Sequence, residues 1–137
     1  GPHHACALSE DGLVYCWGRH QEGQLATNGA PSSPATPTQV PGLSNITALS
    51  AGRFHSCALN ASGQVFCWGA GNEGQLGNGA NLSSTTPVAV LGLTGVSAIG
   101  AGGAYTCALA AGSVYCWGSD SHGQLGNGSA WNSNQPT

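Results

Sequence analysis

Residues 54–69 read FHSCALNASGQVFCWG, and this stretch returns twice with small changes. The other copies are HHACALSEDGLVYCWG at residues 3–18 and AYTCALAAGSVYCWG at residues 104–118. The first cysteines of successive copies lie 51 and 50 residues apart, so the chain repeats with a period near 50 residues. A period of that length, in segments of strand-like composition, is typical of a propeller or a solenoid.

Each repeat is predicted to contain four short strands, and the second repeat is the complete example. Its candidate strands are rich in Val, Ile and aromatic residues and are bounded by Gly, Asn, Ser and Pro. No segment has an amphipathic helical period of useful length, so the sequence predicts an all-β protein of four-stranded antiparallel propeller blades. The candidate strands are residues 45–50, 54–60, 64–69 and 86–90, and residues 31–41 are interpreted as an ordinary loop between strands.

The repeated stretch has the pattern of a β-hairpin whose register can be tested. If Cys57 faces Cys67, a three-residue turn remains that ends in Gly63, and such turns favour glycine at their left-handed last position. The third copy is one residue shorter, and pairing Cys107 with Cys116 leaves the two-residue turn 111–112. A turn that shortens while both cysteines stay opposed is what a real hairpin requires.

The same register places side chains of different size on the two faces of the hairpin. An alanine faces an aromatic ring in all three copies, and Cys, Leu and Val occupy the other face. Both faces are therefore expected to be covered by stacked sheets, as in the blades of a propeller. The tryptophan after each second cysteine is expected to pack in that core; these residues are Trp17, Trp68 and Trp117.

Six cysteines in three equivalent pairs allow three interpretations. Zinc sites usually have close C-x-x-C pairs, whereas here the members of a pair are 10, 10 and 9 residues apart. Opposed strand residues have Cβ atoms about 4.5–5.5 Å apart, close to disulfide reach. Disulfides are therefore favoured over reduced thiols and over a metal site, and they indicate an oxidising compartment. The predicted pairs are Cys6 with Cys16, Cys57 with Cys67, and Cys107 with Cys116.

Four N-x-Ser/Thr sequons point to the same compartment. The alternative is chance, because the chain is rich in Asn, Ser and Thr. Asn81 lies in a long loop and Asn60 beside the hairpin turn, so these two are preferred as sites of N-glycosylation over Asn45. Asn127 ranks below them, because the equivalent Asn28 and Asn78 have the pattern of turn formers.

Composition excludes several classes of function. Only 5% of the residues are charged, the net charge is −3, and the two cationic side chains are Arg19 and Arg53. Neutralising the phosphates of a nucleic acid is not credible with so few cations. No apolar run approaches the roughly 18–20 residues of a membrane span.

No recurrent catalytic or cofactor-binding pattern is present. His4 and His55 are equivalent, but the third repeat has Tyr105 instead, which indicates packing or hydrogen bonding rather than a metal site. The five carboxylates lie in predicted turns or loops without a recurrent acid–base pair, and no G-x-S-x-G elbow occurs. The sequence therefore predicts neither an enzyme nor a cofactor.

The order of AG, H-x-C-A-L, G-x-V-x-C-W-G, G-Q-L-G-x-G, P-x-x-V and G-L resembles the repeat of the regulator of chromosome condensation family. That resemblance covers essentially the whole chain. It implies blades of a seven-bladed propeller, a fold that hosts exchange factors for small GTPases, a secreted inhibitor of β-lactamase, photoreceptors and receptor ectodomains. The regular cysteine pair is more similar to extracellular or cell-surface relatives.

We interpret residues 1–137 as one propeller-repeat region, an excerpt of a longer chain. It divides into a partial repeat at 1–43, a repeat at 44–93 and a partial repeat at 94–137. The predicted function is a non-catalytic, secreted or cell-surface scaffold that binds a protein partner or other copies of itself and carries N-glycans. The alternative is a regulator that acts on a GTPase or another enzyme through one face of the propeller.

Overall fold

The computed structural model of the chain describes residues 4–18, 36–121, 123–126 and 132–137. Within these residues it contains ten strands and no helix, so the predicted all-β class is confirmed. The strands form three antiparallel sheets, one in each repeat. The first sheet contains β1 (His4–Leu8), β2 (Val14–Gly18) and β3 (Thr38–Gln39). The second contains β4 (Ile46–Ala51), β5 (His55–Asn60), β6 (Val65–Gly69) and β7 (Ser84–Ala89), and the third β8 (Val96–Ala101), β9 (Tyr105–Ala110) and β10 (Ser113–Gly118).

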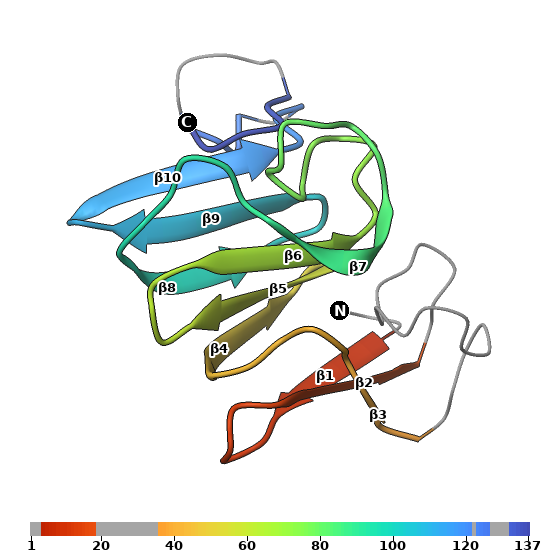
Figure 1. Cartoon of the computed structure of the whole chain (residues 1–137). Coiled ribbons are helices and arrows are strands. Elements are labelled where there is room, and N and C mark those ends of the chain that lie inside the picture. Colours follow the sequence, from red (N-terminus) through yellow and green to blue (C-terminus); the bar gives the residue numbers. More distant parts are fainter. Residues whose placement is uncertain (1–3, 19–35, 122, 127–131) are drawn as a thin grey trace.

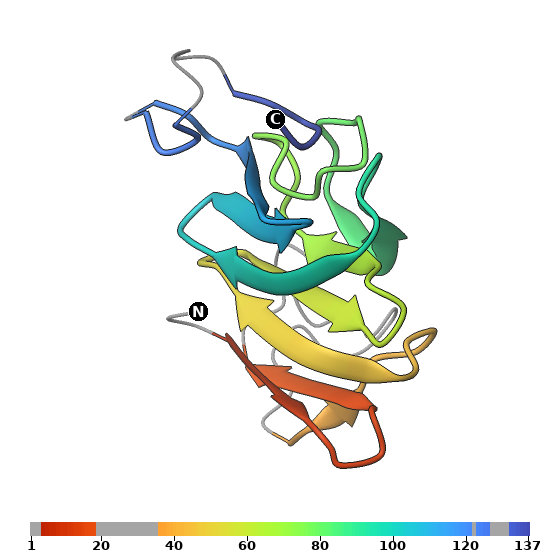
Figure 2. The same cartoon turned by 90° about the vertical axis from the view of Figure 1, so that its left-hand side faces the viewer.

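The sheets are stacked in the order of the repeats, with the four-stranded sheet in the middle (Figures 1 and 2). β4 contacts both β1 on one side and β8 on the other, and β5 also contacts β8. Residues 132–137 return to the third sheet, where Thr137 exchanges two backbone hydrogen bonds of 3.1 Å with Cys116 on β10. The last residues thus run beside β10 as β7 runs beside β6.

The predicted hairpin register is present in all three repeats. Cys57 is opposite Cys67, and the pairs Cys6–Cys16 and Cys107–Cys116 are opposed in the same way. Disulfide bonds join all three pairs, as predicted, and no cysteine of the chain is free. Each sheet is therefore cross-linked across its central hairpin.

The hairpin turns differ between repeats as the lengths of the hairpins require. Gly12 and Gly63 have φ of 80° and 79°, so glycine takes the left-handed position that closes each three-residue turn. In the shorter third hairpin, Ala111 and Gly112 have φ of 52° and 80°, as the two-residue type I′ turn requires. The missing residue is absorbed entirely by the change of turn type.

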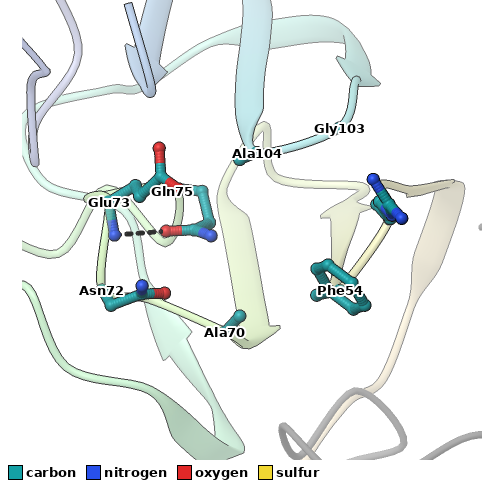
Figure 3. A pocket seen from close by; sticks show the side chains of 8 residues that line it. Phe54, Ala70, Asn72, Glu73, Gln75, Gly103 and Ala104 are labelled. Atoms are coloured by element: carbon teal, nitrogen blue, oxygen red, sulfur yellow. Dashed lines mark hydrogen bonds between the residues drawn. The ribbon is translucent and has the colours of Figure 1, made fainter. Parts of the chain in front are cut away.

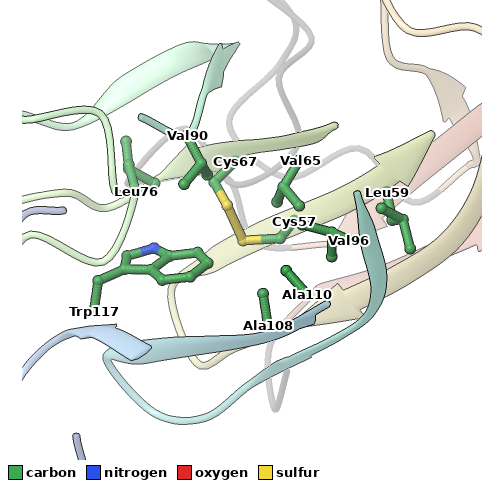
Figure 4. Packing of buried hydrophobic residues seen from close by; sticks show 10 residues of the cluster. All are labelled: Cys57, Leu59, Val65, Cys67, Leu76, Val90, Val96, Ala108, Ala110 and Trp117. Carbon is green, nitrogen blue, oxygen red and sulfur yellow. A yellow bond between two sulfur atoms is a disulfide. The ribbon is translucent and has the colours of Figure 1, made fainter. Parts of the chain in front are cut away.

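Two apolar cores lie between consecutive sheets. The core between the second and third sheets is centred on the disulfide of Cys57 and Cys67, with Trp117 packed against it (Figure 4). The core between the first and second sheets contains Trp68 and the buried Cys16. Trp68 and Trp117 are fully buried, so the expected role of these tryptophans in the core is confirmed for both.

Strand boundaries differ from the prediction in the outer part of the repeat. The fourth strand begins at Ser84, two residues earlier than expected, and the stretch 31–41 contains the short strand β3 in its described part. Interpreting that stretch as a loop was therefore wrong. Asn45 lies outside β4 because its φ of 55° is left-handed rather than extended.

The outer face of the third sheet is less covered than the equivalent face of the second. Leu59 and Val65 are 4% and 3% exposed in the core, whereas their equivalents Leu109 and Val114 are 38% and 68% exposed. The difference arises because no sheet packs on that face among the residues that the structure describes. The disulfide of Cys57 and Cys67 therefore lies in a core between two sheets, whereas that of Cys107 and Cys116 does not.

Replacing both Cys57 and Cys67 by Ala is expected to destabilise the chain more than replacing both Cys107 and Cys116. Either change removes a cross-link that closes a loop of about ten residues, worth about 2–3 kcal/mol. Only the first also empties a site in the core between two sheets. Urea unfolding of the oxidised variants measures both losses, and equal losses would contradict this placement of the core.

Candidate interaction site

A cavity of about 430 Å³ opens where loops of the second and third sheets meet (Figure 3). It lies at the end where β5 begins and β6 finishes, away from the hairpin turn between these strands. Its walls come from the β4–β5, β6–β7 and β8–β9 loops; the lining residues are Arg53, Phe54, Ala70, Asn72, Glu73, Gln75, Gly103 and Ala104.

Arg53 and Phe54 form one side of this cavity. The Arg53 guanidinium carbon lies 5.2 Å from the centre of the Phe54 ring, a cation–π contact. The backbone N–H of Arg53 donates to the carbonyl of Gly103 at 3.1 Å, which ties the β4–β5 loop to the third sheet. The cation is thus held at a fixed place on the cavity rim while its side chain stays exposed.

Gln75 forms the opposite side and is only 2% exposed. Its side-chain Oε1 accepts a hydrogen bond of 2.9 Å from the backbone N–H of Glu73. Its backbone carbonyl accepts two further bonds of 3.0 Å, from the Thr106 hydroxyl and from the Trp117 indole N–H. The β6–β7 loop is therefore fastened to the third sheet directly behind the cavity.

These contacts explain the recurring G-Q-L-G motif. Leu76 is fully buried in the core, and Gly77 has a φ of 68°. A Cβ atom on Gly77 would lie 2.6 Å from the Trp117 indole nitrogen, so glycine makes room for the tryptophan of the next repeat. The sequence indicated turns at these glycines but gave no sign that the glutamine carbonyl receives that tryptophan.

A buried histidine of one repeat is bonded to a hydroxyl of the next. His4 Nε2 lies 2.9 Å from the Ser56 hydroxyl, and His55 Nε2 lies 2.8 Å from the Thr106 hydroxyl. Because Thr106 gives its proton to Gln75, it accepts from His55, whose Nε2 therefore carries a hydrogen. The expected hydrogen-bonding role of His4 and His55 is confirmed, although their partners were not predicted.

Burial keeps His55 neutral. Loss of solvation lowers the pKa of His55 from 6.5 to about 4, and the nearby His4 acts in the same direction. The imidazole therefore serves as a neutral link between sheets at physiological pH. It has no access to solvent, which argues against a role in proton transfer to a bound molecule.

The predicted glycosylation sites lie at different parts of the surface. Asn81 is exposed between β6 and β7, and Asn45 is exposed before β4. Asn60 is half-buried, and its side-chain oxygen accepts bonds from the Ser62 and Gln64 N–H groups in the hairpin turn. Asn127 lies outside the described residues.

The described part of the chain has another, more open cavity of about 280 Å³ beside Glu10 and Asn45. The described residues contain no group of three His, Cys, Asp or Glu side chains arranged to hold a metal ion. Nor do they contain a helix with the length and hydropathy needed to span a membrane. The cavity beside Arg53 is the candidate site because it combines a fixed cation with polar and apolar walls.

Comparison with known proteins assigns the repeat. The family model described as regulator of chromosome condensation repeat matches residues 11–59, 62–109 and 111–137. A human relative, probable E3 ubiquitin-protein ligase HERC3, is 43% identical over 79 residues, which are 56% of this chain and 8% of that protein. The predicted resemblance is confirmed.

Solved structures agree with the fold. Human WBSCR16 superposes with a TM-score of 0.87 at 29% identity, over 98% of this chain and 37% of that chain. The ectodomain of the Physcomitrella patens receptor kinase CR4 gives a TM-score of 0.54 at 25% identity, over 86% and 28%. The blade architecture is that of β-propellers, as predicted, and the chain spans well under half of each of these proteins.

Gly77→Ala is expected to destabilise the chain more than Gly92→Ala. Both glycines have left-handed backbones, with φ of 68° and 70°, so each substitution costs about 1–2 kcal/mol from that source. Only at position 77 does the new methyl group meet Trp117, and overpacking adds about 1–3 kcal/mol. Thermal unfolding followed by tryptophan fluorescence compares the two, and Gly92 is a matched control because its Cβ would face open space.

Stability is expected to fall with pH because of His55. Its pKa is about 4 in the fold and 6.5 when exposed, so the unfolded chain binds the extra proton between these values. The stabilisation is complete above pH 6.5 and decreases as pH falls toward 4, by up to about 3 kcal/mol. His55→Gln keeps a hydrogen-bond donor but cannot titrate, so urea unfolding at pH 7 and pH 4.5 should show a smaller change for this variant. The same change in both proteins would exclude His55 as the cause.

Proposed function

The chain belongs to the regulator of chromosome condensation repeat family, and from that premise we propose that it is a non-catalytic protein-interaction scaffold located outside the cell or on its surface. In this proposal the stacked blades supply a rigid frame, and the loops at their ends bind a protein partner. The chain matches only 8% of the HERC3 relative and 37% of human WBSCR16, so a protein of similar length to either would contain further residues.

The observation that carries the proposed location is the disulfide in every repeat. All six cysteines are paired within their own hairpin, and none is left over for metal binding or catalysis. Structural disulfides form and persist in secreted proteins and at cell surfaces, and are rare in the reducing cytosol. A chain with a cross-link in each blade is suited to an oxidising compartment.

N-glycosylation belongs to the same proposal, with Asn81 as the preferred acceptor. Asn81 and its neighbour Leu82 are exposed, and the Leu82 side chain is 72% exposed, so an oligosaccharyltransferase can reach this loop. Asn60 already uses its side-chain oxygen to hold the hairpin turn, which favours Asn81 over it. The likeness to a receptor ectodomain supports an extracellular setting as well.

A second candidate function is the regulation of a GTPase or another enzyme through one face of the propeller. The observation that favours it is the cavity at one end of the sheets, which is lined by loops rather than by the strands of the core. In this alternative a partner enzyme would bind over the β4–β5 and β6–β7 loops. The sparse charge of the chain favours the scaffold over this alternative.

Alkylation of the native protein, without reduction, tests the proposed location. We expect no cysteine to react before reduction and all six to react afterwards, as read by intact mass. Treatment with peptide N-glycosidase should lower the mass of protein made through the secretory pathway. Asn81→Gln should remove most of that change, with Asn78→Gln, which lies outside any sequon, as the matched control.

Six reactive thiols in protein taken directly from its cellular source would contradict an extracellular scaffold. A partner recovered from that source and identified as a GTPase or another enzyme would favour the second candidate.

A further inference from the structure

We propose that the cavity beside Arg53 binds a single acidic side chain of a protein partner, with the carboxylate received by Arg53 and Gln75. This inference rests on the proposed function in one respect, since it assumes that the loops at this end meet a protein. It adds the chemistry of the contact and the residues that make it.

Arg53 supplies the charge. It is the only lysine or arginine in the described part of the chain, and no carboxylate within that part forms an ion pair with it. The Phe54 ring and the hydrogen bond from the Arg53 backbone N–H to the Gly103 carbonyl hold Arg53 in place, while its side chain stays exposed. An arginine fixed in this way can receive a carboxylate with two parallel hydrogen bonds at a small cost in side-chain entropy.

Gln75 supplies a second donor that points into the cavity. Because its Oε1 is occupied by the Glu73 N–H, the orientation of the amide is set, and its NH₂ group is turned toward the cavity (Figure 3). Besides Asn72 and Gly103, the walls include Ala70, Ala104 and Phe54, whose apolar groups suit the methylene groups of a Glu or Asp side chain. The site thus offers donors for one carboxylate and apolar contact for its stem.

Glu73 restricts the ligand to one negative charge. Glu73 is itself one of the residues that line the cavity, so a second anionic group or a doubly charged phosphate would meet repulsion from its carboxylate. The net charge of −3 acts in the same direction. A lone acidic residue flanked by neutral residues therefore fits better than a phosphorylated or polyacidic segment.

The site is not a requirement of the fold. Where the structure describes them, residues that recur in all three repeats are used in stacking: the Cys57–Cys67 disulfide, Trp68, Trp117, Leu76 and the backbone carbonyl of Gln75. Arg53 and Phe54 do not recur, since Pro2 and His3 occupy their places in the first repeat and Gly103 and Ala104 in the third. A cation and an aromatic ring that stacking does not need are available for recognition.

Nuclear magnetic resonance titration of the oxidised, ¹⁵N-labelled chain tests the site. The probes are the blocked tripeptides acetyl-Gly-Glu-Gly-amide, its Gln counterpart and its phosphoserine counterpart. We expect the Glu peptide to shift the amide signals of Gln75, Gly103 and Ala104 in a saturable manner. The Gln and phosphoserine peptides should bind at least about tenfold more weakly, the difference expected from a lost charge-assisted hydrogen bond or from repulsion by Glu73.

Three variants separate charge from structure. Arg53→Gln should weaken Glu-peptide binding about tenfold, and Arg53→Lys should restore part of it because the charge returns without the planar fork. Glu73→Gln should strengthen binding of the Glu peptide and remove the discrimination against phosphoserine. Glu10→Gln, an exposed carboxylate in the turn at the opposite end of the sheets, should change nothing.

Equal binding of the Glu and Gln peptides, tighter binding of the phosphoserine peptide, absence of saturable shifts, or shifts elsewhere in the chain would each overturn the proposal. These outcomes are independent of the alkylation experiment. A reduced native protein would remove the extracellular scaffold and leave the carboxylate site intact, whereas a failed titration with all disulfides present would remove only the site.

Discussion

The backbone carbonyl of Gln75 is the point at which successive repeats are joined. It accepts the Thr106 hydroxyl and the Trp117 indole N–H, both at 3.0 Å and both from the third sheet. Thr106 in turn accepts the hydrogen of His55 Nε2, so a chain of buried bonds leads from the second sheet to the third. Buried donors without partners are costly, and these residues can therefore be buried only while the two sheets are stacked in one register.

In the second and third repeats, a glycine leaves room for the ring of a nearby side chain. A Cβ atom on Gly52 would lie 2.3 Å from the His55 ring, and one on Gly102 would lie 2.2 Å from the Tyr105 ring. Histidine and tyrosine thus take equivalent places, each over a glycine that precedes it by three residues. This close approach explains the glycine of the AG pair at the end of the first strand of a repeat. The backbone hydrogen bond from that glycine N–H to the carbonyl three residues later is 2.9 Å with His55 and with Tyr105.

The sequence was sufficient to predict the hairpin register and the turns within each repeat. Opposed cysteines define the hairpin register, and the loss of one residue at positions 111–112 is confirmed as a change of turn type. The joint between repeats could not be predicted, because its members lie 31 to 51 residues apart and one of them is a backbone carbonyl. The strand β3 was missed because it has only two residues, too few to show an alternating pattern. The cavity could not be predicted from the repeat pattern, because Arg53 and Phe54 have no equivalents in the other repeats.

Recurrence also separates the parts of the molecule that stabilise it from those that can recognise a partner. In the described part of the chain, Trp68, Trp117, Leu76 and the disulfide of Cys57 and Cys67 are buried between sheets, so these side chains are unavailable to any other molecule. Strand β5 begins at the cavity and ends at the hairpin turn, so the two ends of a blade differ in chemistry although the same hairpin builds both. Positions in these loops that stacking does not use, such as those of Arg53 and Phe54, can differ between repeats without disturbing the stack. A rigid stack of nearly identical blades can thereby present a site, such as that of Arg53 and Phe54, that exists at only one of its joints.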